Sequence, residues 1–125
     1  MRKRIILFFA VTSLILGVSG LPASAQSQME MNAAAAASAE KADKELTAVY
    51  QKLHESLKDD AQAQQLLEIA EKSWLKYRDD EAQYEAASDM GGSIHSLAVS
   101  TVMKRLTEER TKCLAGILKD GPNIP

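Results

Sequence analysis

The sequence predicts an all-α protein, with three long antiparallel helices in an up-down-up bundle after a cleaved signal peptide. Apolar residues recur at spacings of three and four along three stretches of the chain, which is the repeat of an amphipathic helix. Two short polar or glycine-containing breaks separate these stretches, and short connections make neighbouring helices antiparallel. No segment shows the sustained alternation of apolar and polar residues that a half-buried strand requires, so we expect no β-strand.

Residues 1–25 have the three parts of a secretory signal peptide. Residues 2–4 are basic, residues 5–18 are apolar, and Ala23 and Ala25 supply small side chains at positions −3 and −1 of a cleavage site. The apolar run of about 14 residues is shorter than the roughly 20 that a membrane-spanning helix needs, which argues against a transmembrane anchor. We therefore expect cleavage after Ala25 and a periplasmic or secreted protein.

Cleavage leaves residues 26–125 as a single helical domain, and it makes that domain acidic. The whole chain has 15 basic and 17 acidic residues, and three of the basic ones lie in the signal peptide. The mature part therefore carries 12 basic against 17 acidic residues, a net charge of −5. Nucleic-acid binding needs clustered Lys and Arg, so we expect none. A basic protein is the partner that this charge favours, and membrane contact is expected only during export.

The first helix is expected to cover roughly 28 residues and to end near Leu57. Its start is rich in alanine, including five in a row at Ala33–Ala37, which favours a helix because Ala loses least on entering one. A polar break follows at residues 58–60, where Asp60 is a candidate N-cap for the next helix. The apolar stripe of the first helix consists of Ala39, Ala42, Leu46, Val49, Tyr50, Leu53 and Leu57.

The second helix is expected to run from Ala61 to Ala87, and the third from a Ser93 cap to Gly121-Pro122, with a frayed tail to Pro125. The paired glycines at residues 91 and 92 allow the turn between them. The second stripe consists of Ala63, Leu66, Leu67, Ala70, Trp74, Tyr77 and Tyr84. The third consists of Ile94, Leu97, Ala98, Val102, Met103, Leu106, Cys113, Leu114 and Ile117.

Antiparallel register brings two pairs of opposite charges level with each other. Asp43 falls within one turn of Arg78, and Glu71 falls level with Arg110, so both are candidate interhelical ion pairs. Arg suits such positions because its planar fork can hold a carboxylate with two hydrogen bonds. The favoured interpretation is that these pairs fix the register and add little net stability. The alternative makes one of them part of a ligand or partner site.

Three aromatic residues, Tyr50, Trp74 and Tyr77, are interpreted as core or core-edge side chains before they are interpreted as a binding face. An exposed tyrosine among them would favour the binding face. The lone Cys113 excludes an intramolecular disulfide. We expect it to be a buried structural thiol, with pairing between two chains as the alternative.

The motifs of catalysis and cofactor binding are missing from the sequence. His54 and His95 lie on different elements, without a further ligand at zinc spacing. Met29 and Met31, with His54, are only a remote candidate for a copper site. Nothing assembles a nucleophile, a base and an oxyanion site, so we expect no catalytic residue, no cofactor, no metal and no enzyme activity.

Four spaced motifs, in order, resemble those of the LprI-type lysozyme-inhibitor family, whose members are small exported helical proteins of bacteria. The resemblance covers nearly all of the mature chain. It implies a helical envelope protein that in some members inhibits lysozyme, and an acidic inhibitor suits the strongly basic animal lysozymes. The motif residues are Asp43, Leu46, Thr47, Tyr50 and Leu53; the run Trp74 to Asp79; Gly91 to Ile94; and Leu106, Thr107, Arg110 and Thr111.

The chain departs from this family in its cysteines. Members commonly have Cys where this chain, aligned on the motifs, has Ala34, Ala82 and Val102. The three positions fall on three different expected helices, so thiols there would staple the bundle, and this chain must rely on its core.

Two functions follow from these observations. The first is an exported protein-binding module that inhibits lysozyme by binding it. The alternative is a structural or stress-related envelope protein that self-associates through its Ala-rich first helix and has no enzyme target. The sequence leaves the oligomeric state and the contact residues open.

Overall fold

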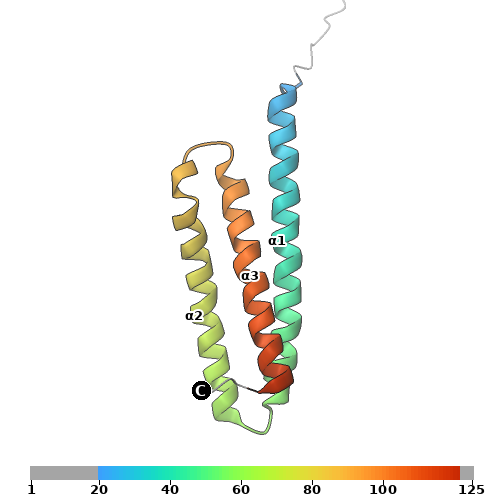
Figure 1. The fold of residues 1–125 in the computed structure, drawn as a ribbon, viewed down its shortest axis with the longest axis vertical. Coiled ribbons are helices and arrows are strands. Elements are labelled where there is room, and N and C mark those ends of the chain that lie inside the picture. Colours follow the sequence, from blue (N-terminus) through green and yellow to red (C-terminus); the bar gives the residue numbers. More distant parts are fainter. Residues whose placement is uncertain (1–19, 122–125) are drawn as a thin grey trace, which may run out of the picture.

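The computed structural model describes residues 20–121 as three long helices with short connections (Figure 1). No strand occurs among these residues, so the all-α up-down-up bundle is confirmed. Most of the expected signal peptide, residues 1–19, and the tail at 122–125 lie outside the described residues. The elements are α1 (Ala23–Ser56), α2 (Ala61–Glu85), the short 3-10 helix η1 (Ala87–Asp89) and α3 (His95–Asp120).

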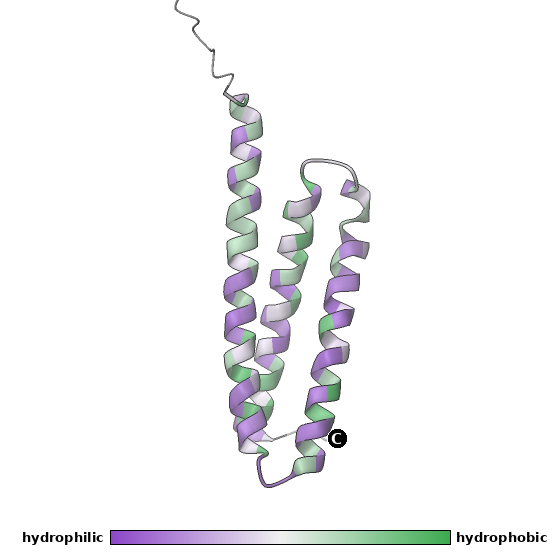
Figure 2. Ribbon diagram, turned by 180° about the vertical axis from the view of Figure 1, so that it is seen from behind, coloured by the Kyte–Doolittle hydropathy of each residue, from purple (hydrophilic) through white to green (hydrophobic). Residues whose placement is uncertain are grey.

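Helix α3 is the element that joins the bundle, since it packs along α1 and also contacts α2. The backbones of α1 and α2 lie farther from each other than from α3, which lies between them in Figures 1 and 2. The apolar core is centred on Leu46 and Leu53 of α1 and Leu114 of α3. Side chains packed against this centre are Val49, Tyr50, Leu67, Trp74 and Ile117.

The helix ends agree with the sequence at three points. Asp60 caps α2, because its Oδ1 accepts a hydrogen bond from the Ala63 amide at 2.9 Å. Helix α1 ends at Ser56, beside the expected Leu57, but it begins as early as Ala23. Helix α3 ends at Asp120, and Gly121 follows with a φ of 80°, a conformation that favours glycine.

The expected cap of the third helix is wrong. Ser93 makes no capping hydrogen bond, and α3 begins two residues later at His95. The carbonyl of Ser93 instead accepts a hydrogen bond from the Asn32 side chain of α1 at 3.2 Å. Helix α2 ends at Glu85 rather than at Ala87, because the chain tightens into η1 before Gly91, whose φ is 82°.

The inward face of α2 differs from the expected apolar stripe. Leu66, Tyr77 and Tyr84 are exposed, and Ala70 also faces solvent. The side chains turned toward the bundle follow the same helical spacing but include two charges, which interhelical ion pairs make tolerable. These inward residues are Leu67, Glu71, Trp74, Arg78 and Ala82.

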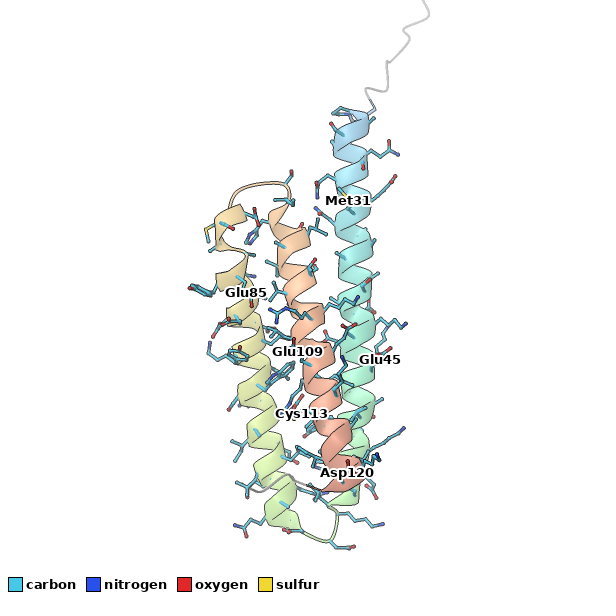
Figure 3. The ribbon with its side chains drawn as sticks, viewed as in Figure 1. Met31, Glu45, Glu85, Glu109, Cys113 and Asp120 are labelled. Carbon is cyan, nitrogen blue, oxygen red and sulfur yellow. The ribbon has the colours of Figure 1, made fainter. Side chains whose placement is uncertain are left out.

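Cys113 is exposed, which corrects the expectation of a buried thiol (Figure 3). Its neighbour Leu114 occupies the core at 1% exposure, and adjacent residues of a helix point about 100° apart. Both residues fit the apolar spacing of an amphipathic helix in the sequence, but only Leu114 packs against α1.

The N-terminal part of α1 extends beyond the loop that joins α2 to α3 (Figure 1). The hydrogen bond from Asn32 to Ser93 marks the level of that loop. The weakly hydrophobic upper part of α1 is visible in Figure 2, and it includes the alanine run. Ala33, Ala34, Ala36 and Ala37 are all exposed, so the run forms helix without contributing to the core.

Replacing Leu114 by Ala should lower the free energy of unfolding by about 2–5 kcal/mol, because it leaves a cavity at the centre of the core. Leu118→Ala, one turn further along α3, is the matched control, since Leu118 is 38% exposed. Urea unfolding followed by circular dichroism measures both. Equal losses in the two variants would contradict the assignment of the core.

Candidate binding groove between α1 and α2

A groove with a volume of about 490 Å³ lies between α1 and α2. It exists because the two helices are held apart while both are anchored to α3. Polar and apolar side chains of both helices form its walls. The lining residues are Asp43, Leu46, Thr47 and Tyr50 of α1, with Glu68, Glu71, Lys72, Leu75 and Arg78 of α2.

Arg78 connects all three helices at one end of the groove. Its Nη1 donates to Oδ1 of Asp43 on α1 at 2.5 Å and to Oγ1 of Thr107 on α3 at 3.3 Å. Its Nε and Nη2 lie 2.9 and 2.8 Å from Oδ1 of Asp79. The side chain is only 8% exposed, so its charge depends on these carboxylates rather than on water.

The second pair, Glu71 with Arg110, joins α2 to α3 behind the groove. Nε and Nη2 of Arg110 both donate to Oε2 of Glu71, at 3.0 and 2.9 Å. The guanidinium carbons of Arg78 and Arg110 each lie 5.7 Å from the centre of the Trp74 ring. Trp74 therefore makes a cation–π contact with each of the two arginines, which is favourable because the face of an indole ring is electron-rich.

The opposite end of the groove is closed by contacts between the end of α1 and the start of α2. Nε2 of His54 lies 2.7 Å from Oε1 of Glu68. The side-chain Nε2 of Gln64 donates a hydrogen bond to the backbone carbonyl of His54 at 2.9 Å. The Tyr50 ring lies against His54, with 5.9 Å between ring centres. Burial, followed by the charges of Glu68 and Glu71, raises the pKa of the Tyr50 hydroxyl.

The structure brings both candidate ion pairs together and places most of the predicted residues at this groove. Asp43, Glu71, Arg78 and Tyr50 line it, while Trp74 and Arg110 lie directly behind it. Tyr77 is 50% exposed and belongs to a different face of α2. An exposed tyrosine was expected to favour a binding face, and this one lies outside the groove.

Three lining residues of α2 were missed by the sequence analysis. Glu68, Lys72 and Leu75 follow one another at spacings of four and three, so they share one side of the helix. That periodicity was available in the sequence, but a mixed charged and apolar side does not indicate which neighbour it faces.

The remaining candidates do not form a site in the described residues. Among residues 20–121, no group of three or more His, Cys, Asp or Glu side chains could hold a metal ion. Met31 and His54 are separated by 23 residues of α1, or about 35 Å of helix, so they cannot share a copper ion. Ala23 and Ala25 lie in the first turn of α1, which has no side-chain cap. Within the same described range, no helix is long and apolar enough to cross a membrane.

Replacing Arg78 by Ala should lower the free energy of unfolding by about 3 kcal/mol, because the contacts that this buried side chain makes with Asp43, Asp79 and Thr107 are lost together. Arg105→Ala is the matched control, since Arg105 also joins α3 to α2 by an ion pair with Glu85 but is 47% exposed. We expect that variant to lose less than about 1 kcal/mol. Similar losses of unfolding free energy in the two variants, measured by urea unfolding, would show that the Arg78 ion pairs contribute no more than an exposed surface pair.

Comparison with known proteins identifies the bundle. The sequence matches the family described as Lysozyme inhibitor LprI over residues 21–114, a span that includes every residue lining the groove. The fold is similar to the crystal structure of a DUF1311 family protein from Pseudomonas putida KT2440, with a TM-score of 0.67 and 24% sequence identity. That similarity covers 73% of this chain and 93% of the other. No curated protein matches. The chain belongs to the LprI lysozyme-inhibitor family.

Proposed function

We propose that this protein is exported, acts in the periplasm or outside the cell, and inhibits a lysozyme by binding it. The observation that carries the proposal is the family match, which extends over residues 21–114 and so spans most of the bundle. Under this proposal the protein acts by binding alone and carries out no catalytic step.

The charge of the mature domain supports a basic lysozyme as the target. Residues 26–125 carry a net charge of −5, and opposite charge speeds the encounter of two proteins. Such steering raises the association rate more than it sets the final affinity. Affinity then has to come from a surface that is already shaped before binding, and a bundle held by interhelical ion pairs provides one.

The direct test is a lysozyme activity assay with the protein expressed as the full chain and purified after export. We expect inhibition that saturates at one inhibitor per enzyme and weakens as salt rises, because screening removes the electrostatic steering. Animal lysozymes of different charge should be compared. No inhibition at micromolar excess over any of them would reject the proposal.

Export is tested separately by the mass of the purified protein. We expect the mature chain to begin at Gln26, because signal peptidase requires small residues at −1 and −3. Ala25→Phe should block processing, whereas Ser24→Phe, at position −2, should leave it intact. An unprocessed wild-type chain, or equal processing of both variants, would contradict cleavage after Ala25.

The alternative function, self-association of an envelope protein, has one structural observation in its favour. The part of α1 that extends past the α2–α3 loop bears the exposed Met29 and Met31, and the largely exposed alanine run follows it at the level of the loop. Small side chains allow helices to approach closely, so this segment could pair with another copy. Light scattering distinguishes the two functions, because a monomer at high concentration that inhibits lysozyme leaves no role for self-association.

A further inference from the structure

The three acidic residues of the groove share a feature that the bundle itself does not use. Asp43 engages its neighbours through Oδ1, Glu68 through Oε1 and Glu71 through Oε2. Among residues 20–121, the second oxygen of each carboxylate accepts no hydrogen bond from the protein. One groove thus presents three carboxylates that the bundle has already oriented and that keep capacity for another donor.

The cations of the groove are less available than its carboxylates. Arg78 is buried and is engaged by both Asp43 and Asp79. An anionic ligand would have to displace one of these carboxylates from a nearly water-free guanidinium, which is costly. Lys72 has no ion pair among the described residues, but it is exposed, so its charge is screened by water. The lining has three carboxylates against two cations, and this balance favours a cation as the ligand.

Apart from Thr47, the uncharged side chains of the lining are largely apolar and suit an alkyl chain. Leu46, Leu75 and Tyr50 line the same groove as the carboxylates, and Leu75 remains 38% exposed. The volume of about 490 Å³ falls in the range of pockets that enclose small organic groups. Lys and Arg combine a long apolar stem with a charged end, and such side chains pack their stems on apolar surface while the charged end reaches polar partners.

We propose that the groove between α1 and α2 receives a lysine or arginine side chain from the surface of its protein partner. The stem packs on Leu46, Leu75 and Tyr50, and the charged end donates to the free oxygens of Asp43, Glu68 and Glu71. This assignment rests on the proposed function for the identity of the partner, a basic lysozyme.

The outer face of α2, with Leu66, Tyr77 and Tyr84, is the competing surface. It exposes more apolar side chains, but nothing in the structure indicates what covers it. The groove differs in having a defined shape and a charge that selects the sign of the ligand.

Two threonines provide a matched pair of variants. Thr47 lines the groove, and Thr101 lies on α3 away from it. Both are exposed, and each donates from Oγ1 to the carbonyl four residues earlier at 2.8 Å. Thr47→Arg fills the groove with a guanidinium of the protein's own, while Thr101→Arg makes the same chemical and charge change elsewhere. Circular dichroism and urea unfolding establish that both variants are folded.

The affinity of the exported protein for lysozyme, measured by calorimetry, is the first arm of the test. We expect Thr47→Arg to weaken binding about tenfold or more, the loss of one well-placed charged contact, and Thr101→Arg to weaken it by less than about threefold through net charge alone. Equal affinities of the two variants for lysozyme would overturn the groove as the contact site and would leave the proposed function standing.

The second arm uses N-acetyl-arginine N-methylamide as a probe and does not depend on lysozyme. In an NMR titration of the wild-type protein we expect amide shifts at Thr47, Lys72 and Leu75, and their loss in Thr47→Arg but not in Thr101→Arg. If lysozyme does not bind at all, the proposed function fails and this arm alone judges the groove. Shifts spread over the surface, or absent from the groove, would overturn the inference.

Discussion

The buried guanidinium of Arg78 is the contact on which the arrangement of the three helices depends. The backbones of α1 and α2 approach each other less closely than either approaches α3, so α1 and α2 meet through their side chains. Arg78 bridges this gap to Asp43 and reaches Thr107 on α3 with the same nitrogen. A charge taken out of water is costly, and here two carboxylates, a hydroxyl and the Trp74 ring offset that cost. A polar network thus supplements the leucine core where α2 meets its two neighbours.

The groove is a consequence of the same design. If α2 turned a row of leucines toward α1, the two helices would close on each other and leave no space. Glu71 and Arg78 occupy the inward positions of α2 instead, and their partners lie on two different helices. The ion pairs therefore link α2 to both of its neighbours beside the groove. The groove that remains is lined by residues of the motifs through which the sequence resembles its family, including Asp43, Leu46 and Thr47.

Much of the fold could be predicted because helix periodicity, short breaks and capping chemistry act locally. The three helices, the Asp60 cap and the Gly121 end follow from residues within a few positions of each other. The facing of α2 could not be predicted in this way, because apolar periodicity alone assigns Tyr77 and Tyr84 to the core and Glu71 and Arg78 to solvent. The inward charges were indicated only by the residues that lie at the same level in antiparallel helices. That register argument predicts ion pairs, but it does not predict a groove. The predicted burial of Cys113 was wrong for a related reason. Helical spacing fits Cys113 and Leu114 equally well, and contact with the neighbouring helix decides which of the two is buried.

A double-mutant cycle on Asp43 and Arg78 tests most directly whether this contact links α1 to α2. Asp43→Asn, Arg78→Met and the double variant are compared with the wild-type protein by urea unfolding. If the two side chains stabilise the bundle through each other, the losses of the two single variants will sum to more than the loss of the double variant. We expect this difference, the coupling free energy, to be about 1 kcal/mol or more. Losses that add to within about 0.3 kcal/mol would contradict the account, because they would mean that the two side chains act independently and that other contacts hold α1 and α2 in place.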